Sequence, residues 1–381
     1  MKKITFTLLL LIASWQATQA QDMSMYKALN DSAYQTMADY QAGNKYQKDA
    51  ILFMDMVADT HPYYIKPERR SEWFAKKPAL MEKCKTIETD EDFVDALIEV
   101  LGPLHDKHTD LSTMKRIQEM KKQQNANQQV EKTGAIDREH IMRHHDSYYD
   151  YQLFTDKGIC YLQFNNCANA PDYPFSTFIN DMFAKMDEEG IKTLVVDMQY
   201  NGGGNSRLCT DLFIHLYPLN KMKFITTYIR YSDFLATYYP KFEDPKKNWE
   251  KDGHVNELYQ VPAFKIPADF QQPKLFEGQV VFVMGKKTYS SAGILITYAR
   301  DNHVGTIIGT TSTFGPSHYG EVLPYRLPNT DVIGGISCKY FARPDESKSE
   351  EPFMQPDIEL NLEDKDAAWQ FIVEKYGKSD K

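Results

Sequence analysis

Short apolar runs alternate with helical stretches in the second half of the chain, and this order limits the folds that the chain can adopt. Four runs have the length and composition of buried strands: Gly158–Phe164, Lys192–Met198, Gln279–Met284 and Val304–Gly309. Helices are expected between and after them, at Phe175–Met186, Ser206–Leu216 and Ser290–Arg300. Because the connections are short, the pattern predicts βαβ units and a largely parallel sheet in an α/β fold.

The first part of the chain is expected to be helical. Tyr46–Thr60 and Asp92–Leu101 place apolar residues at helical spacing, and Thr89 is suited to cap the second helix. Roughly 360 residues are too many for one hydrophobic core, so we expect two domains. We predict a helical N-terminal domain over 21–114, a polar linker or exposed helix over 115–148, and an α/β core over 149–381 with an irregular insertion at about 218–277.

Residues 1–20 have the layout of a signal peptide. Two lysines precede an apolar stretch from Ile4 to Ser14, and a small residue, Ala20, suits cleavage before Gln21. The apolar stretch of about eleven residues is shorter than the ~20 that a membrane-spanning helix needs. We therefore expect export to the periplasm or the medium, without a stable membrane anchor.

The net charge argues against nucleic acid as a partner. The formal charge is −9, and removal of residues 1–20 with their two lysines makes it about −11. An acidic chain without a basic stripe lacks the electrostatic attraction that phosphate backbones require.

The cysteines show no functional spacing. They are odd in number and widely scattered, at Cys84, Cys160, Cys167, Cys209 and Cys338. This arrangement is typical neither of a metal site nor of a disulfide framework, so we expect small buried hydrophobic residues. A single disulfide is the alternative in an oxidising compartment.

A serine stands where a buried strand turns into a helix. Ser290 follows the strand Gln279–Met284 after a tight turn and begins the next helix. A serine there can cap the helix, which is the more frequent role. It can also act as a nucleophile, because the helix start directs N–H groups and a positive dipole toward an oxyanion.

Three glycines, Gly202, Gly203 and Gly204, follow the strand Lys192–Met198. Glycines at the carboxyl end of a strand let main-chain N–H groups approach a ligand closely. Such donors suit an oxyanion or a phosphate, and a plain structural turn is the alternative. The spacing matches neither GxGxxG nor GxxxxGK, so nucleotide binding is not indicated.

The segment Leu104–Asp110 contains His105 and His108 beside Asp106 and a second acid. Two histidines with neighbouring acids could bind a metal, but no further ligand cluster is visible and we predict no metal. A histidine in a polar loop can instead serve as a general base, since imidazole titrates near neutral pH.

In this order, the motifs resemble the C-terminal processing (tail-specific) serine protease superfamily, which includes the tricorn core protease and the interphotoreceptor retinoid-binding protein. The segment Val196–Gly204 is similar to the DLRxNxGG segment of that family. The likeness also covers Asp59–Pro62, His105–Leu111, Gly158–Phe164, Thr288–Gly293, Ile307–Gly309 and Glu350–Asp357. The resemblance implies a crotonase/ClpP-like core of stacked βαβ units, preceded by a small helical N-terminal domain.

The resemblance implies that Ser290 is the nucleophile. Ser291 is the alternative, and Ser290 is preferred because Gly309 then lies nineteen positions downstream, as the family pattern requires. The implied oxyanion donors are the backbone N–H of Ser291 and that of Gly203 or Gly204.

The base implied by the resemblance is a histidine. Many family members use a lysine in a Phe-Gly-Lys context, but here Phe314-Gly315 is followed by Pro316, and no lysine lies between Lys287 and Lys339. The tricorn-like variant instead has a histidine at the position of His108.

The resemblance also implies an acid that holds the histidine. By position that acid is Glu350, with Glu351, Glu346 and Asp345 as competitors. His318 is a rival to His108 as the base.

One module of the family is predicted to be absent. Only about fifty residues, in a highly polar segment, separate His108 from Gly158, which is too few for the peptide-binding PDZ module.

The sequence thus predicts a serine peptidase that cleaves a peptide or protein substrate through an acyl-enzyme, without a metal or organic cofactor. An esterase would share the mechanism. The alternative from another class is a catalytically inactive binding protein of the same fold for an apolar ligand or polypeptide, which the 13% aromatic content would suit.

Overall fold

The computed structural model describes residues 25–378, except 105, 128–140, 144–146 and 255–256. The chain forms two compact units. One comprises Met1–Gln129, Thr227–Val261 and His318–Phe341, and the other Val130–Thr226, Pro262–Ser317 and Ala342–Lys381. This division differs from the expected contiguous domains, because strands from two later segments pair with strands of the N-terminal part.

A parallel sheet forms the centre of the second unit. Its strands among the described residues are β3 (Tyr149–Phe154), β4 (Ile159–Phe164), β5 (Thr193–Asp197), β8 (Gln279–Met284), β9 (Thr306–Gly309) and β12 (Ile358–Glu359). The spatial order is β12-β9-β8-β5-β4-β3, and every neighbouring pair is parallel except β3 and β4. Strands β4, β5, β8 and β9 confirm the four predicted strands and the largely parallel sheet.

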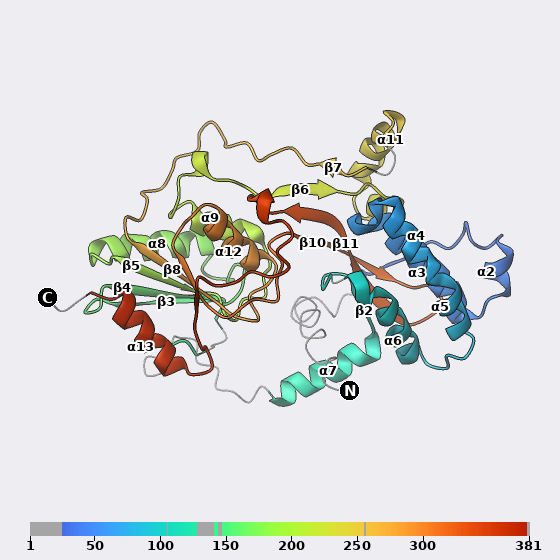
Figure 1. The fold of residues 1–381 in the computed structure, drawn as a ribbon, viewed down its shortest axis with the longest axis horizontal. Coiled ribbons are helices and arrows are strands. Elements are labelled where there is room, and N and C mark those ends of the chain that lie inside the picture. The colour runs from blue at the N-terminus through green and yellow to red at the C-terminus, as the bar shows by residue number, and fades with distance from the viewer. Residues whose placement is uncertain (1–24, 105, 128–140, 144–146, 255–256, 379–381) are drawn as a thin grey trace. The chain divides into compact units, whose positions relative to one another are not determined.

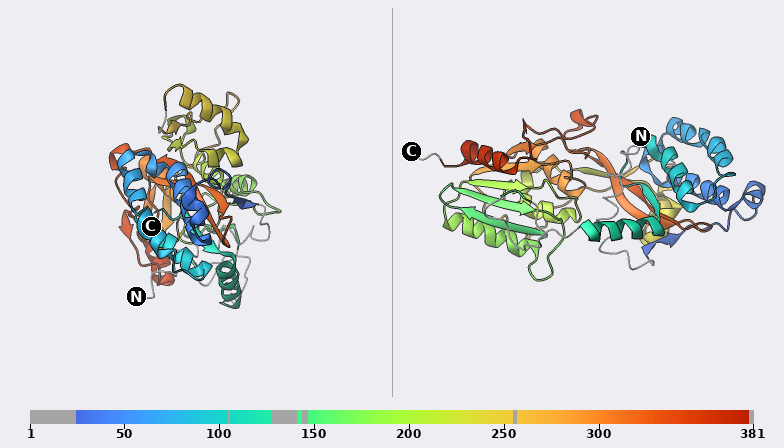
Figure 2. Two further views of the ribbon diagram at one scale, coloured as in Figure 1. Left: turned by 90° about the vertical axis from the view of Figure 1, so that its right-hand side faces the viewer. Right: turned by 90° about the horizontal axis from the view of Figure 1, so that it is seen from below.

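Helices cover both faces of this sheet. They are α8 (Phe175–Glu188), α9 (Ser206–Phe213), α12 (Ser291–Asp301) and α13 (Lys365–Tyr376). Ala368 and Ile372 of α13 pack on Ile159 and Val195 of the sheet. Figures 1 and 2 show α13 on one face and α8 on the other, with α9 and α12 alongside α8 in Figure 1. Burial on both faces explains why the strands read as continuous apolar runs.

The first unit contains a second sheet, which is mixed. Its strands are β1 (Lys27–Ala28), β2 (Asp110–Thr113), β6 (Thr226–Ile229), β7 (Tyr259–Gln260), β10 (His318–Arg326) and β11 (Val332–Ala342). The order is β1-β10-β11-β6-β7, and β2 also pairs with β11. The long strands β10 and β11 pair antiparallel, as do β2 and β11 and also β6 and β7, while β1 pairs parallel with β10. The sheet therefore joins segments that lie far apart in the sequence.

Helices of the first unit pack on that sheet, as Figure 1 shows for α3 and α4. They are α2 (Ala38–Ala42), α3 (Lys45–Thr60), α4 (Pro67–Ala75), α5 (Lys77–Lys83), α6 (Asp90–Leu101) and α7 (Met114–Asn127). Phe53 and Phe93 share a buried core with Leu323 and Tyr325 of β10. Helices α3 and α6 confirm the prediction for this region, and Thr89 caps α6 by accepting a hydrogen bond from the Asp92 N–H at 3.1 Å.

The expected irregular insertion at 218–277 has more structure than predicted. It contains β6, β7, α10 (Asp233–Tyr238) and α11 (Glu243–Lys251). Residues 227–261 belong to the first unit, because β6 neighbours β11 in its sheet. Four tyrosines of this segment pack on the core of the first unit, namely Tyr231, Tyr238, Tyr239 and Tyr259.

All five cysteines are buried and free, which confirms the expectation of small hydrophobic residues. The predicted signal peptide lies outside the described residues. In the part of the chain that is described, no helix has both the length and the apolar character needed to cross a membrane.

Candidate active site

Ser290 lies in the turn between β8 and α12, in a strained backbone conformation. It has φ 52° and ψ −125°, and it occupies the N-cap position of α12 without a capping hydrogen bond from its side chain to the helix. Strained backbone of this kind costs about 1–3 kcal/mol and persists where the surrounding structure imposes it. Sharp strand-to-helix turns hold the nucleophile in hydrolases of other folds. Helix capping is therefore not the role of this hydroxyl.

The neighbouring serine is engaged elsewhere. Ser291 is buried, and its hydroxyl donates to the Gly204 carbonyl at 2.6 Å. Ser290 is only partly buried, so a reactant can reach its side chain. These environments favour Ser290 over Ser291 as the reactive hydroxyl.

The glycine loop lies against the Ser290 turn. Gly203 and Gly204 have φ values of +103° and +135°. A Cβ atom on Gly203 would lie 2.7 Å from Ser290 Cβ and 3.0 Å from Ser291 N. Only glycine fits such an approach, because any side chain would overlap the turn. The structure thus brings together Ser290, Ser291 and the two predicted glycines.

Two main-chain N–H groups at this place, those of Ser291 and Gly204, have no hydrogen-bond acceptor among the described residues. The Gly203 carbonyl accepts from the Cys167 N–H at 3.1 Å. Because the peptide group is planar and trans, the Gly204 N–H points the opposite way. The Gly203 N–H itself donates to Asn201 Oδ1 at 2.9 Å. Of the two glycines, Gly204 is therefore the one whose N–H can serve an oxyanion.

Asn201 holds the glycine loop in place by hydrogen bonds. It is fully buried, and its Nδ2 donates to the Phe164 carbonyl at the end of β4 at 2.8 Å. Its Oδ1 accepts the Gly203 N–H, and its main-chain carbonyl accepts the Tyr289 N–H at 3.0 Å. The side chain of Asn201 thus ties the end of β4 to the glycine loop, and its main chain ties both to the serine turn.

The predicted base lies in the first unit, just before β2. The His108 side chain is 15% exposed, and its Nδ1 lies 3.5 Å from Asp106 Oδ1. The ring centre of His318 lies 6.2 Å from that of His108, and His318 stacks on Phe341. The first unit therefore brings the predicted base and its rival together.

Asp106 is a residue of this cluster to which sequence reasoning gave no role. Burial would raise the pKa of its carboxyl, but hydrogen bonds from His108 and His61 outweigh burial and hold that pKa well below its ordinary value. Asp106 is therefore ionised at neutral pH. Among the described residues, this cluster included, no group of three or more His, Cys, Asp or Glu side chains is arranged to hold a metal ion.

The predicted acid, Glu350, is exposed in the second unit. Its competitor Glu351 is bound to Arg343, with 2.6 Å between Arg343 Nη1 and the Glu351 carboxylate. Arg343 also holds Asp301, at the end of α12. The role of Glu350 and the approach of His108 to Ser290 stay predictions.

Comparisons with known structures agree with this fold. Mature CPAF in complex with lactacystin is 11% identical, with a TM-score of 0.59 over 87% of this chain and 97% of that one. A candidate peptidase from Parabacteroides merdae is 16% identical, with a TM-score of 0.54 over 82% and 89%. A lipoprotein from Streptococcus agalactiae is 12% identical, with a TM-score of 0.50 over 86% and 96%. No curated protein sequence matches the chain.

A parallel sheet with helices on both faces, a strained serine at a helix start and a glycine loop against it are the features expected of a serine hydrolase. The sequence model of Peptidase family S41 matches residues 158–360, and the chain belongs to that family. This membership confirms the resemblance read from the sequence motifs.

Proposed function

We propose that the protein is an exported serine peptidase that cleaves peptide bonds through an acyl-enzyme. Ser290 Oγ attacks the carbonyl carbon while His108 takes the Ser290 proton. The resulting oxyanion accepts hydrogen bonds from the N–H groups of Ser291 and Gly204. His108 then gives its proton to the leaving amine, and water releases the acyl group by the same steps.

The observation that carries the proposal is the backbone of Ser290. A conformation that costs free energy is retained at the start of α12, with Gly203 so close that no side chain is tolerated there. The two N–H groups without acceptors among the described residues belong to the neighbours of these two residues in the chain, Ser291 and Gly204. In other enzymes the loss of one such donor lowers kcat about 10²–10³-fold.

A fluorophosphonate probe tests the nucleophile directly. We expect the purified full chain to form one covalent adduct, which mass spectrometry maps to the peptide that contains Ser290. Ser290→Ala should form none. Ser291→Ala should still form the adduct, because the main-chain N–H of residue 291 is retained. Its rate should be lower than that of wild type. An adduct of unchanged yield in Ser290→Ala would assign the nucleophile to another residue. No adduct in folded wild-type protein would support a binding protein instead.

Peptide and ester substrates separate a peptidase from an esterase. A mixed peptide library, analysed by mass spectrometry, should show cleavage products with the wild-type chain and none with Ser290→Ala. Turnover of p-nitrophenyl esters without any peptide cleavage would identify an esterase. The family membership supports the peptidase.

The layout of residues 1–20 supports export. We expect the mature chain, isolated from cell fractions or medium, to begin at Gln21. An intact N-terminus in the cytoplasmic fraction would contradict export while leaving the chemistry untouched.

A further inference from the structure

The carboxylate of Asp106 is the centre of a buried polar network in the first unit. Its Oδ2 accepts hydrogen bonds from His61 Nε2 at 3.0 Å, Thr109 Oγ1 at 2.7 Å and Ser337 Oγ at 2.7 Å. Its Oδ1 accepts the main-chain N–H of His108 at 3.0 Å and lies 3.5 Å from His108 Nδ1. A buried carboxylate with this many donors has a fixed orientation.

The hydrogen bonds of His61 define its tautomer. Its Nδ1 accepts the Tyr63 N–H at 3.1 Å and therefore carries no hydrogen. The proton is on Nε2, which donates to Asp106. Burial lowers the pKa of His61, although Asp106 opposes this effect, so the ring is neutral. His61 thus orients Asp106 without neutralising its negative charge.

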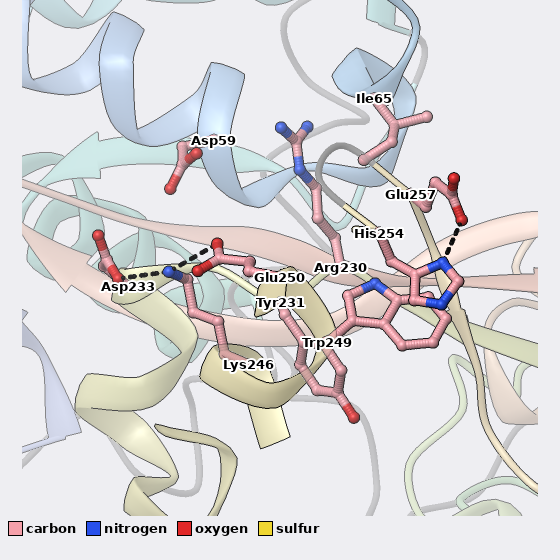
Figure 3. Close-up of a pocket in the computed structure, with 10 residues that line it drawn as sticks. All are labelled: Asp59, Ile65, Arg230, Tyr231, Asp233, Lys246, Trp249, Glu250, His254 and Glu257. Atoms are coloured by element: carbon pink, nitrogen blue, oxygen red, sulfur yellow. Dashed lines mark hydrogen bonds and ion pairs between the residues drawn. The ribbon is translucent and has the colours of Figure 1, made fainter. Parts of the chain in front are cut away.

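Arg230 fixes the main chain of His61 from the side of a polar cavity. Its Nη1 donates to the His61 carbonyl at 3.0 Å. Arg230 lines a cavity of about 200 Å³, shown in Figure 3, where Lys246 lies between Asp233 and Glu250 at 3.0 and 2.9 Å. Burial lowers the pKa of Arg230 to about 10, so it stays charged at neutral pH. His61 is therefore held through both its ring and its main chain.

We propose that Asp106 is the positioning residue of His108, with His61 holding Asp106 in place. Asp106 keeps the proton of His108 on Nδ1, so that Nε2 carries the lone pair that takes the Ser290 proton. When that proton is transferred, His108 carries both protons and Asp106 stabilises the imidazolium without being protonated. The inference rests on the proposed function, and it gives Asp106 the role that sequence position gave to Glu350.

The charge of Asp106 is what qualifies it for this task. The carboxylate stays ionised well into the acidic range, because its interactions with His108 and His61 lower its pKa by more than burial raises it. Asp110, four residues on, is a buried acid of the opposite kind. Among the described residues its carboxylate accepts a hydrogen bond only from the Leu111 N–H, and burial, with a smaller effect of the Asp106 charge, raises its pKa to about 6. Asp110 is thus a matched control that lies outside the network.

The first experiment compares fluorophosphonate labelling rates of Asp106→Asn and Asp110→Asn. We expect Asp106→Asn to label at least about 100-fold more slowly than wild type, because an amide favours the wrong histidine tautomer. Asp110→Asn should stay within about threefold. The acidic limb of the pH–rate profile should also move to lower pH in Asp106→Asn, because the imidazolium forms less readily. The ring of His318 also lies beside that of His108, so His318→Gln is measured in parallel and should leave this movement unchanged.

The rival acid is tested in the same assay. If Glu350→Gln lost the labelling while Asp106→Asn kept the wild-type rate, the inference would be overturned. Labelling that survives in Ser290→Ala would instead overturn the proposed function, so the two failures are distinguishable. Asp106→Glu, which restores the charge on a longer side chain, should recover part of the rate at an unchanged pH profile.

A second measurement needs no substitution of Asp106. In ¹⁵N spectra of the wild-type chain, assigned with His61→Gln and His108→Gln, we expect a proton on Nδ1 of His108 and on Nε2 of His61. The opposite tautomer of His108 would overturn the inference even if Asp106→Asn did not fold.

Discussion

A methyl group on Gly203 would lie 2.7 Å from Ser290 Cβ, closer than any two such atoms in a relaxed protein. The serine turn and the glycine loop are therefore in direct contact, and there is no room between them for a side chain at position 203. We expect this contact to matter for both the stability and the reactivity of the site.

Gly203→Ala should lose both properties. The substituted residue would need a φ near +103° and would overlap Ser290, so we expect a loss of about 1–3 kcal/mol in unfolding free energy and at least ~100-fold in labelling rate. The control is Gly253→Ala, at φ +91° with open space around it. That variant should lose stability alone. Wild-type labelling by Gly203→Ala would contradict the expected contact.

Asn201→Ala should destabilise the contact between the glycine loop and the serine turn. The substitution leaves the Phe164 carbonyl and the Gly203 N–H buried without their partner, at about 1–3 kcal/mol for each group. We expect a loss of about 2–5 kcal/mol in denaturant unfolding and a clear fall in labelling rate. Asn205→Ala, which removes an exposed cap of α9, should cost about 1 kcal/mol and leave labelling intact. Equal behaviour of the two variants would argue against a clamp.

Arg343→Met should destabilise the second unit strongly. Arg343 and Asp301 are both fully buried and joined at 2.5 Å, so the substitution leaves an unpaired buried carboxylate. We expect a loss of about 3–5 kcal/mol in denaturant unfolding. The double variant Arg343→Met with Asp301→Asn should recover part of that loss. A loss below ~1 kcal/mol in the single variant would show that the pair is not needed.

His215 should make the protein less stable in acid. Burial lowers the pKa of His215 from 6.5 to about 4, and the ring stacks on Phe183. Between these values the unfolded chain binds a proton that the folded chain does not, so stability is complete above pH 6.5 and falls as the pH drops toward 4. We expect about 2 kcal/mol from this group. His215→Phe should flatten the decline in unfolding midpoints measured across this range. If the decline of the unfolding midpoint with falling pH were the same in His215→Phe, the loss of stability would come from other titrating groups.

The thiols should be unreactive in the folded chain. Burial raises the pKa of Cys84 and Cys338 to about 12, and the thiolate is the reactive form. We expect a chromogenic disulfide reagent to titrate no thiol in native protein and all five after unfolding. A thiol that reacts rapidly in native protein would contradict the burial of the five cysteines.

The fold of the second unit could be predicted from sequence because its signals are local. Each strand is buried along its whole length, and each helix has an apolar stripe, so β4, β5, β8 and α8 were evident within short windows. The pairing of β10 and β11 with β1 and β2 was not evident. Its determinants are contacts between residues more than 200 positions apart, and glycines at 320, 334 and 335 interrupt the apolar pattern.

The site was predictable in part for the same reason. Ser290 and the glycines stand at the ends of predicted strands, where chemistry in such folds is expected. The Ser290 backbone angles could not be predicted, since they depend on the close approach of Gly203. Asp106 did have a local signal: an aspartate two residues before His108 can accept that residue's N–H in a short turn, as it does here. Family position drew attention to Glu350 instead.

The discontinuous first unit has a consequence for the newborn chain. Ser337 joins Asp106 across 231 residues, so the loop that carries His108 lacks this support until β11 has been synthesised. At ribosomal rates of about 5–20 residues per second, that interval lasts roughly 10–50 s. The serine turn is translated before β11. The network around Asp106 is therefore completed only after Ser290 has been synthesised.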